Sequence, residues 1–155
     1  MTPIIHNVTA YGFRDIPKEF QEKVKVYALD AMDKDEQSVI FNALEAVALS
    51  CRAENIQPRT VQVFITRDGH IELFDDPDCR AELMRLVIIK TDKMKDLDMM
   101  RKVVCCVEEL CHALWHEDDE IEVKEIVTRV INRYYNKNFG LYDLYRREWI
   151  EANKT

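Results

Sequence analysis

Glycine and proline are scarce in this chain, and that scarcity constrains its fold more than any other feature. The 155 residues include only three glycines and four prolines. Because these residues interrupt helices and form tight turns, a chain with so few of them is expected to form long helices. The residues are 47% apolar and 33% charged, the balance of an ordinary globular protein. We therefore expect a single domain, residues 1–155, that is mainly helical.

Apolar residues recur at helical spacing in several stretches, and these predict five to six helices. The helices are expected to begin near Asp15-Ile16-Pro17, at 33–35, at Asp76-Pro77, at Thr91 or Asp92, at Asp119 and after the loop 136–140. The first carries Phe20, Val24, Tyr27 and Ala31 along one side. The fourth is expected to run to about Trp115. The fifth begins with Asp119 and Glu122 at the spacing of a capping box.

The periodicity changes between residues 60 and 74. Residues 60–66 are rich in β-branched and aromatic side chains, Asp68-Gly69 is a strong turn signal, and residues 71–74 supply a returning strand. The apolar run at 86–90 is either a third strand or the end of a helix, because so short a run has no diagnostic period. The predicted fold class is therefore α+β, mainly helical, with a small antiparallel sheet.

The charge is distributed unevenly. The net charge of −7 argues against general nucleic-acid binding, since phosphate backbones are held chiefly by Lys and Arg. Residues 124–155 nevertheless carry seven basic and four acidic side chains, against 15 and 25 in residues 1–123. Aromatic residues interleave with this basic end: Arg133, Tyr134, Tyr135, Lys137, Phe139, Tyr142, Tyr145, Arg146 and Arg147. Such a region can contact RNA or an acidic partner, although an exposed helix face with its aromatic residues packed inward is the commoner arrangement.

The expected location is the cytoplasm. No apolar run approaches the roughly 20 residues that cross a bilayer, and residues 1–7 lack the features of a signal peptide. The five cysteines include no CxxC pair, which argues against a zinc knuckle, and their odd number argues against a disulfide framework. We expect reduced, buried thiols.

One face of the helix that ends near Trp115 gathers reactive groups. On a helical wheel with about 100° per residue, Glu108, Glu109, His112 and His116 lie within roughly 60° of Cys105. Residues four apart are neighbours on such a face, the spacing by which a helix offers two ligands to one metal ion. The alternative is a simple amphipathic helix whose polar side faces water.

The order of residues in this helix supports the interpretation of this face as a metal-binding site. Residues 103–116 read Val-Val-Cys-Cys-Val-Glu-Glu-Leu-Cys-His-Ala-Leu-Trp-His. This segment resembles the active helix of zincin metallopeptidases, in which an apolar stretch leads into H-E-x-x-H. It is most similar to the minigluzincins and the ImmA/IrrE-type peptidases, whose helices often read HELGHALxH. The resemblance matches Glu109 to the general base and His112 to the second zinc histidine. It also implies a sheet before the active helix and a carboxylate ligand from the next helix, which carries Glu120, Glu122 and Glu125.

The motif departs from that family at two positions. Glu108 stands where the first zinc histidine is expected, and Cys111 replaces a glycine. A carboxylate can bind zinc, but it differs from imidazole in charge, reach and softness. A catalytic zinc site normally has three protein ligands and an open position for water.

The third ligand is predicted from the geometry of two helices joined by a short turn. If the chain turns near Asp118 and the helices run antiparallel, His112 faces Glu125 and His116 faces Glu122. The candidate metal ligands are therefore His112, Glu108, Glu122, Glu125 and His116.

Three functions are compatible with these features. The first is a degenerate zincin-like protein that does not catalyse a reaction and acts by binding a protein partner, with no metal or a weakly held divalent ion, zinc foremost. The second is an active metal-dependent hydrolase with Glu108 or His116 as an unusual ligand, His112 as a ligand and Glu109 as the base. The third is a helical regulatory or adaptor domain unrelated to peptidases.

Overall fold

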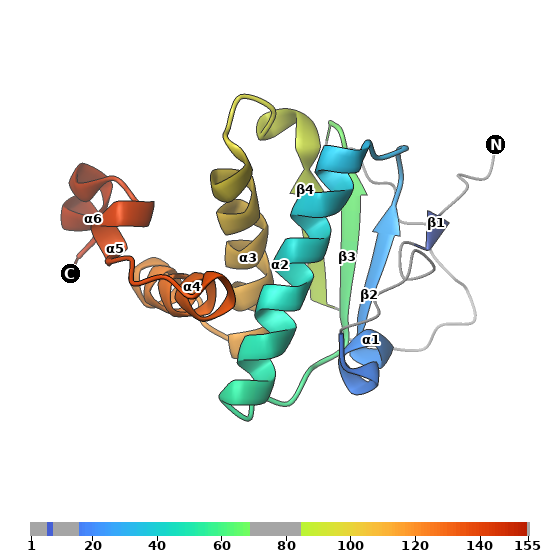
Figure 1. The fold of residues 1–155 in the computed structure, drawn as a ribbon, viewed down its shortest axis with the longest axis horizontal. Helices are drawn as coiled ribbons and strands as arrows, with labels where there is room; N and C mark the ends of the chain where they lie inside the picture. The colour runs from blue at the N-terminus through green and yellow to red at the C-terminus, as the bar shows by residue number, and fades with distance from the viewer. Residues whose placement is uncertain (1–5, 8–15, 69–84, 155) are drawn as a thin grey trace.

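The computed structural model describes residues 6–7, 16–68 and 85–154, and it has the predicted α+β, mainly helical fold (Figure 1). Six α-helices and four strands occur in the described part of the chain. In chain order they are β1 (His6–Asn7), α1 (Lys18–Lys23), β2 (Val24–Ala28), α2 (Lys34–Ala53), β3 (Val61–Thr66), β4 (Arg85–Lys90), α3 (Met99–Trp115), α4 (Glu120–Tyr135), α5 (Leu141–Leu144) and α6 (Arg147–Asn153), with a short 3₁₀ helix at Thr91–Lys93.

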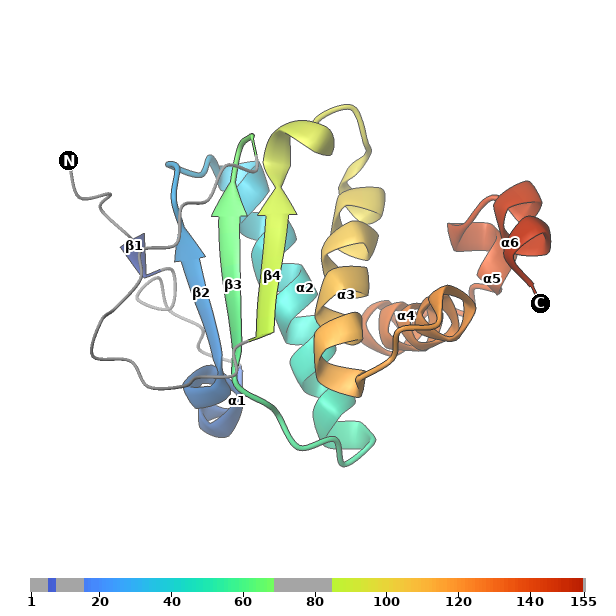
Figure 2. The same cartoon turned by 180° about the vertical axis from the view of Figure 1, so that it is seen from behind.

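The sheet is mainly parallel, so the predicted antiparallel sheet is wrong. Its strand order is β1-β2-β3-β4; β2, β3 and β4 run parallel, and only the short β1 is antiparallel to its neighbour (Figure 2). Parallel neighbours need a long crossover connection, which α2 supplies between β2 and β3. A strand inside a parallel sheet is apolar on both faces, and five of the six residues of β3 are buried. The predicted turn at Gly69, the returning strand at 71–74 and the helix at 76–77 lie outside the described residues.

Two strands of the sheet lie where the sequence left the structure open or predicted a helix. The run at 86–90 belongs to β4, where Val87 and Ile89 are buried and their neighbours are more exposed. The helix predicted through Val24 is wrong, because α1 ends at Lys23 and β2 follows at once. Residues of β2 alternate between buried and half-buried positions, as expected for a strand paired with β3.

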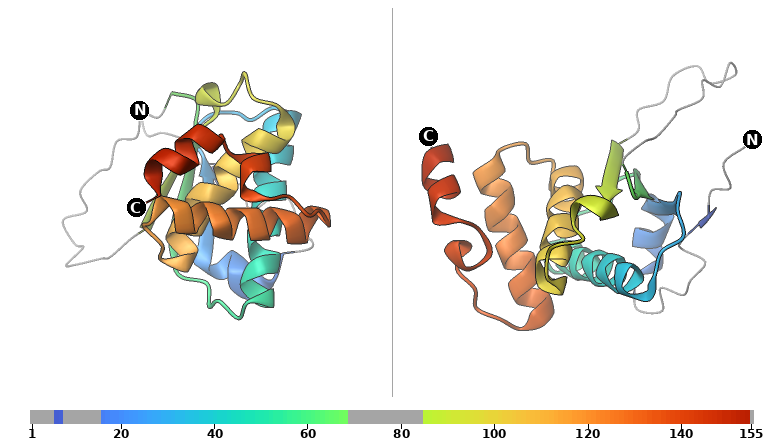
Figure 3. Two further views of the ribbon diagram at one scale, coloured as in Figure 1. Left: turned by 90° about the vertical axis from the view of Figure 1, so that its left-hand side faces the viewer. Right: turned by 90° about the horizontal axis from the view of Figure 1, so that it is seen from above.

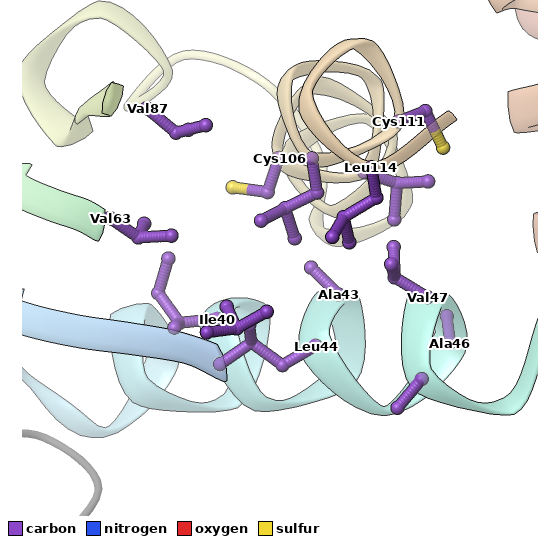
Figure 4. Close-up of a cluster of buried hydrophobic side chains, with 14 of the residues drawn as sticks. Ile40, Ala43, Leu44, Ala46, Val47, Val63, Val87, Cys106, Cys111 and Leu114 are labelled. Atoms are coloured by element: carbon purple, nitrogen blue, oxygen red, sulfur yellow. The ribbon is translucent and has the colours of Figure 1, made fainter. Parts of the chain in front are cut away.

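The main core lies between α2, α3 and the sheet. Figure 4 shows Ile40, Leu44 and Val47 of α2 directed toward the region between α3 and the strands. Cys106 and Leu114 of α3, together with Val63 and Val87, are among the other buried side chains of this cluster. Because one side of α3 is committed to this core, its opposite side is available to pack against other elements.

Helix α3 begins later than predicted. Its N-cap is Asp98, whose side chain accepts a hydrogen bond from the Arg101 N–H at 2.9 Å. Thr91 and Asp92, the predicted caps, belong to the separate 3₁₀ turn. The end near Trp115 and the start of the next helix after Asp119 are confirmed.

Helix α4 forms a further layer on the far side of α2 and α3 from the sheet, and α5 and α6 lie beyond it (Figures 1 and 3). It crosses α3 at a steep angle rather than running antiparallel to it (Figure 3). Its first turns contact α3, while Arg129 and Arg133, farther along, bind Glu54 of α2. None of the helices in the described ranges combines the length and apolar character needed to cross a bilayer.

Candidate functional site

Part of the polar side of α3, around Glu108 and His112, is covered by α4. The side chains of Glu108 and His112 are only 20% and 23% exposed. They lie on the side of the helix opposite the buried Cys106 and Leu110, and α4 packs against them. A simple amphipathic helix with a solvated polar face does not account for this burial.

Three side chains bring metal-binding atoms together. One ligand atom from each of Glu108, His112 and Glu120 lies within 4.8 Å of the others. We call these three residues the donor group. His112 Nε2 is 3.6 Å from Glu120 Oε1. Two carboxylates and an imidazole are chemically suited to a divalent cation such as zinc.

A backbone contact orients the imidazole. His112 Nδ1 lies 2.7 Å from the carbonyl oxygen of Glu117. Because a carbonyl can only accept a hydrogen bond, Nδ1 donates in this contact, and Nε2 is the ring nitrogen that lies toward Glu120. Metal-binding histidines are commonly oriented by such a contact on the second ring nitrogen.

A lysine ammonium lies among the donors. Lys124 is only 6% exposed, and its Nζ donates to Glu108 Oε1 and Glu120 Oε2, both at 3.0 Å. Burial lowers the pKa of Lys124, but hydrogen bonds to Glu108 and Glu120 and their negative charge outweigh burial, and the net pKa is raised. The side chain is therefore an ammonium at neutral pH. It neutralises one of the two carboxylate charges in the donor group.

The other oxygen of Glu108 is bound from the C-terminal segment, defined here as residues 141–153. The Tyr145 hydroxyl donates to Glu108 Oε2 at 2.9 Å. Burial, and then the adjacent Glu108 carboxylate, raise the pKa of Tyr145 far above its ordinary value, so it remains a donor. The Lys124 Nζ also lies 4.2 Å from the centre of the Trp149 ring and 5.2 Å from that of Tyr145, within cation–π range.

An open cleft of about 790 Å³ adjoins this cluster. The starts of α3 and α4 and the C-terminal segment line it, and its walls include Arg101, Cys105, Glu108, Lys124, Arg146 and Trp149. The volume is in the range of small-molecule sites. Glu108 and Glu120 of the donor group, together with Lys124, therefore form part of the wall of this cleft.

The remaining predicted residues are not members of the donor group. Glu109 is exposed and offers no atom to the group, but it lies near it: partial burial raises the pKa of Glu109, with smaller and opposing effects from the charges of His112 and Glu108. His116 ends α3 in the left-handed conformation, with φ of 58°, and its Nε2 lies 2.6 Å from Arg85 Nη2. Glu122 and Glu125 are exposed and also outside the donor group, so the pairings predicted for His112 and His116 are wrong.

The steep crossing of the two helices explains this correction. Antiparallel helices would match His112 with Glu125, but α4 crosses α3 steeply. Glu120, at the very start of α4, therefore meets His112, and Lys124 one turn later meets Glu108.

Sequence reasoning missed Lys124 and Tyr145. One signal for Lys124 was present: it precedes Val127 and Ile131 on the apolar side of α4, where a charged residue needs a buried partner. Tyr145 had no such local signal, because its contact with Glu108 joins residues 37 positions apart.

No family model, curated protein or solved structure matches this chain. The interpretation of the site therefore depends on its geometry and on the sequence of α3.

Proposed function

We propose that this protein is a degenerate zincin-like protein that has lost catalysis and acts by binding a protein partner. The observation that carries the proposal is the Lys124 ammonium, 3.0 Å from both Glu108 and Glu120. In a zincin, the ligands matching Glu108 and His112 hold a metal ion, whereas here a cation of the chain itself neutralises the carboxylates. A divalent ion must compete with this ammonium for the same oxygen atoms.

Two further features disfavour hydrolysis. Tyr145 binds the second oxygen of Glu108, so this carboxylate has little freedom to rearrange around a metal ion. Glu109, the counterpart of the general base, is exposed and outside the donor group. A metallohydrolase needs an open metal position with a base beside it.

The cleft is the proposed surface for the partner. It brings the guanidinium groups of Arg101, Arg146 and Arg147 together with the rings of Tyr142 and Trp149. Arginine and aromatic residues are enriched at protein interfaces. Four carboxylates, those of Glu108, Glu120, Asp143 and Glu148, also line the cleft, and Lys124 is paired with the first two. The cleft therefore offers charges of both signs to a partner.

The second candidate function is an active metal-dependent hydrolase. The orientation of His112 favours it, since the Glu117 carbonyl contacts Nδ1 and leaves Nε2 on the side of Glu120. In this alternative Glu108, His112 and Glu120 hold a divalent ion, zinc foremost, which polarises a bound water or a carbonyl group. Lys124 must then leave the two carboxylates.

Metal analysis of protein purified without a histidine tag separates these functions. We expect far less than one equivalent of zinc and no hydrolysis of a peptide library. Glu108→His restores the missing zinc histidine, so it should raise zinc affinity at least tenfold. Glu122→His adds an imidazole at an exposed position outside the donor group and should leave the affinity unchanged.

Two results would favour the hydrolase instead. One equivalent of tightly held zinc in the wild-type protein, lost in His112→Ala, would favour the hydrolase and contradict the degenerate site. Peptide turnover that depends on Glu109 would do the same.

A further inference from the structure

The C-terminal segment is attached to the rest of the protein over a small area. Figures 1 and 3 show it beyond α4, remote from the sheet. Ile150 is its one fully buried residue in the described range, and the open cleft separates part of the segment from the start of α3. Leu144 and Tyr145 also pack against the core, and Tyr145 and Trp149 contact Glu108 and Lys124.

These contacts meet at the donor group. The ammonium that binds Glu108 and Glu120 is the same one that lies 4.2 Å from the Trp149 ring. The carboxylate that receives this ammonium also receives the Tyr145 hydroxyl. A change in the position of Glu108 or Lys124 therefore acts directly on Tyr145 and Trp149 of the C-terminal segment.

We propose that Lys124 is a built-in substitute for a divalent metal ion and holds the C-terminal segment over the donor group, so that metal binding and docking of this segment exclude each other. The inference depends on the proposed function, because it treats Glu108, His112 and Glu120 as the remnant of a zincin metal site. It adds a regulatory property to that site: a divalent cation acts as a signal that releases residues 141–153.

Charge explains why the two states are exclusive. With the ammonium in place, the carboxylates of Glu108 and Glu120 together with Lys124 carry a net charge of about −1, since two carboxylates face one cation. A divalent ion satisfies the same two carboxylates alone. If both cations were present, they would repel each other at the short separation that shared ligands impose.

The aromatic contacts of the C-terminal segment depend on the position of the Lys124 ammonium. Cation–π attraction to Trp149 and Tyr145 exists only while the Lys124 charge remains at their rings. When Glu108 turns toward a metal ion, the Tyr145 hydroxyl also loses its acceptor. The segment then retains Ile150 as its main buried anchor, so its backbone amides should become easier to open to solvent.

The test compares Lys124→Met, which removes the charge, with Lys124→Arg, which keeps it. Zinc binding is measured by calorimetry, and the opening of residues 141–153 by amide hydrogen exchange. We expect Lys124→Met to bind zinc at least tenfold more tightly than the wild type and to exchange faster in this segment even without zinc. Lys124→Arg should behave as the wild type. Adding His112→Ala to Lys124→Met should remove the gained affinity, and Lys137→Met, at an exposed position, serves as the control.

Zinc added to the wild-type protein gives the direct readout. Saturating zinc should accelerate exchange in residues 141–153 while exchange in α2 stays unchanged. If Lys124→Met is unfolded by circular dichroism, Tyr145→Phe replaces it. That variant frees Glu108 Oε2 and should raise zinc affinity several-fold.

The inference fails if Lys124→Met folds but gains no zinc affinity, because Lys124 is then only a structural ion-pair partner. It also fails if zinc binds without changing exchange in the segment. Either failure leaves the proposed function intact, whereas tight zinc binding and peptide turnover in the wild type would contradict the proposed function itself.

Discussion

At the scale of single residues, the carboxylate of Glu54 is paired with two arginines of α4. Glu54, at the end of α2, accepts hydrogen bonds from Arg129 at 2.8 and 3.1 Å and from Arg133 at 2.8 Å. The bonds from Arg129 lower the pKa of Glu54 to about 2, against burial, and Arg133 and Trp115 add to the effect. This carboxylate therefore connects α2 to α4 through charge as well as packing.

Glu54→Gln tests that connection. The pKa of Glu54 in the folded protein lies below its ordinary value of 4.5, so its contribution to stability is complete above about pH 4.5 and is lost as the pH falls toward 2. We expect Glu54→Gln to lower the free energy of unfolding by about 2 kcal/mol at pH 7, allowing for partial solvent screening. Urea unfolding at pH 7 and pH 3 should show the difference from wild type shrinking at low pH. Glu125→Gln, at an exposed carboxylate of α4, is the control; a loss of equal size at both pH values would refute the charge argument.

The cysteines also depend on their surroundings. Cys51, Cys106 and Cys111 are buried free thiols, as predicted, whereas Cys105 is exposed. Burial raises the pKa of Cys51 to about 12, with a smaller contribution from the Glu54 charge. Burial likewise raises the pKa of Cys106 and Cys111, so these thiols remain protonated at neutral pH.

At the scale of secondary-structure elements, α3 has more than one acidic residue that could cap its start. Asp92 and Asp98 both precede the apolar stretch of α3, and Thr91 or Asp92 was predicted to be the cap. Only Asp98 has its carboxylate on the N–H of a helical residue, Arg101. Residues 91–93 form a separate 3₁₀ turn because the chain leaves β4 at that point.

Replacing Asp98 or Asp92 by alanine tests which of the two aspartates caps α3. Asp98→Ala removes the cap of α3 and should lower the free energy of unfolding by about 1 kcal/mol. Asp92→Ala should change it by less than about 0.5 kcal/mol, as for an ordinary surface substitution. Thermal and urea unfolding measure both. A larger loss for Asp92→Ala would move the start of the helix back to the predicted position.

At the scale of the whole molecule, β4 contributes one buried face to the core between the sheet and the helices. In β4, Ile89 is 4% exposed and opposes Ile65 of β3, whereas Ile88 is 39% exposed. The two neighbouring isoleucines are therefore chemically identical but lie in opposite environments.

Their alanine variants measure the contribution of the core beneath the sheet. Ile89→Ala should lower the free energy of unfolding by about 2–5 kcal/mol, because it removes buried methyl groups and leaves a cavity. Ile88→Ala should cost less than about 1 kcal/mol. Equal losses would mean that residues 86–90 are not a strand with one buried face.

The sequence by itself determined the elements that local signals specify. The apolar stripe of α2, the helix over residues 103–115, the start of α4 after Asp119 and the strand at 61–66 all follow from side-chain spacing and capping within a few residues. The pairing of Glu108 and His112 on one face also followed, because residues four apart in a helix are neighbours.

Only the tertiary structure decided how these elements meet. The direction of β3 relative to its neighbours depends on the crossover through α2, and the strand at 24–28 forms because it pairs with β3. The third member of the donor group depends on the crossing angle of α3 and α4, which brings Glu120 and Lys124 to the site instead of Glu122 and Glu125. These features arise from packing between segments distant in the chain, so no local sequence pattern predicts them. The role of Lys124 belongs with them, since this lysine of α4 reaches the Glu108 carboxylate only when α3 and α4 meet.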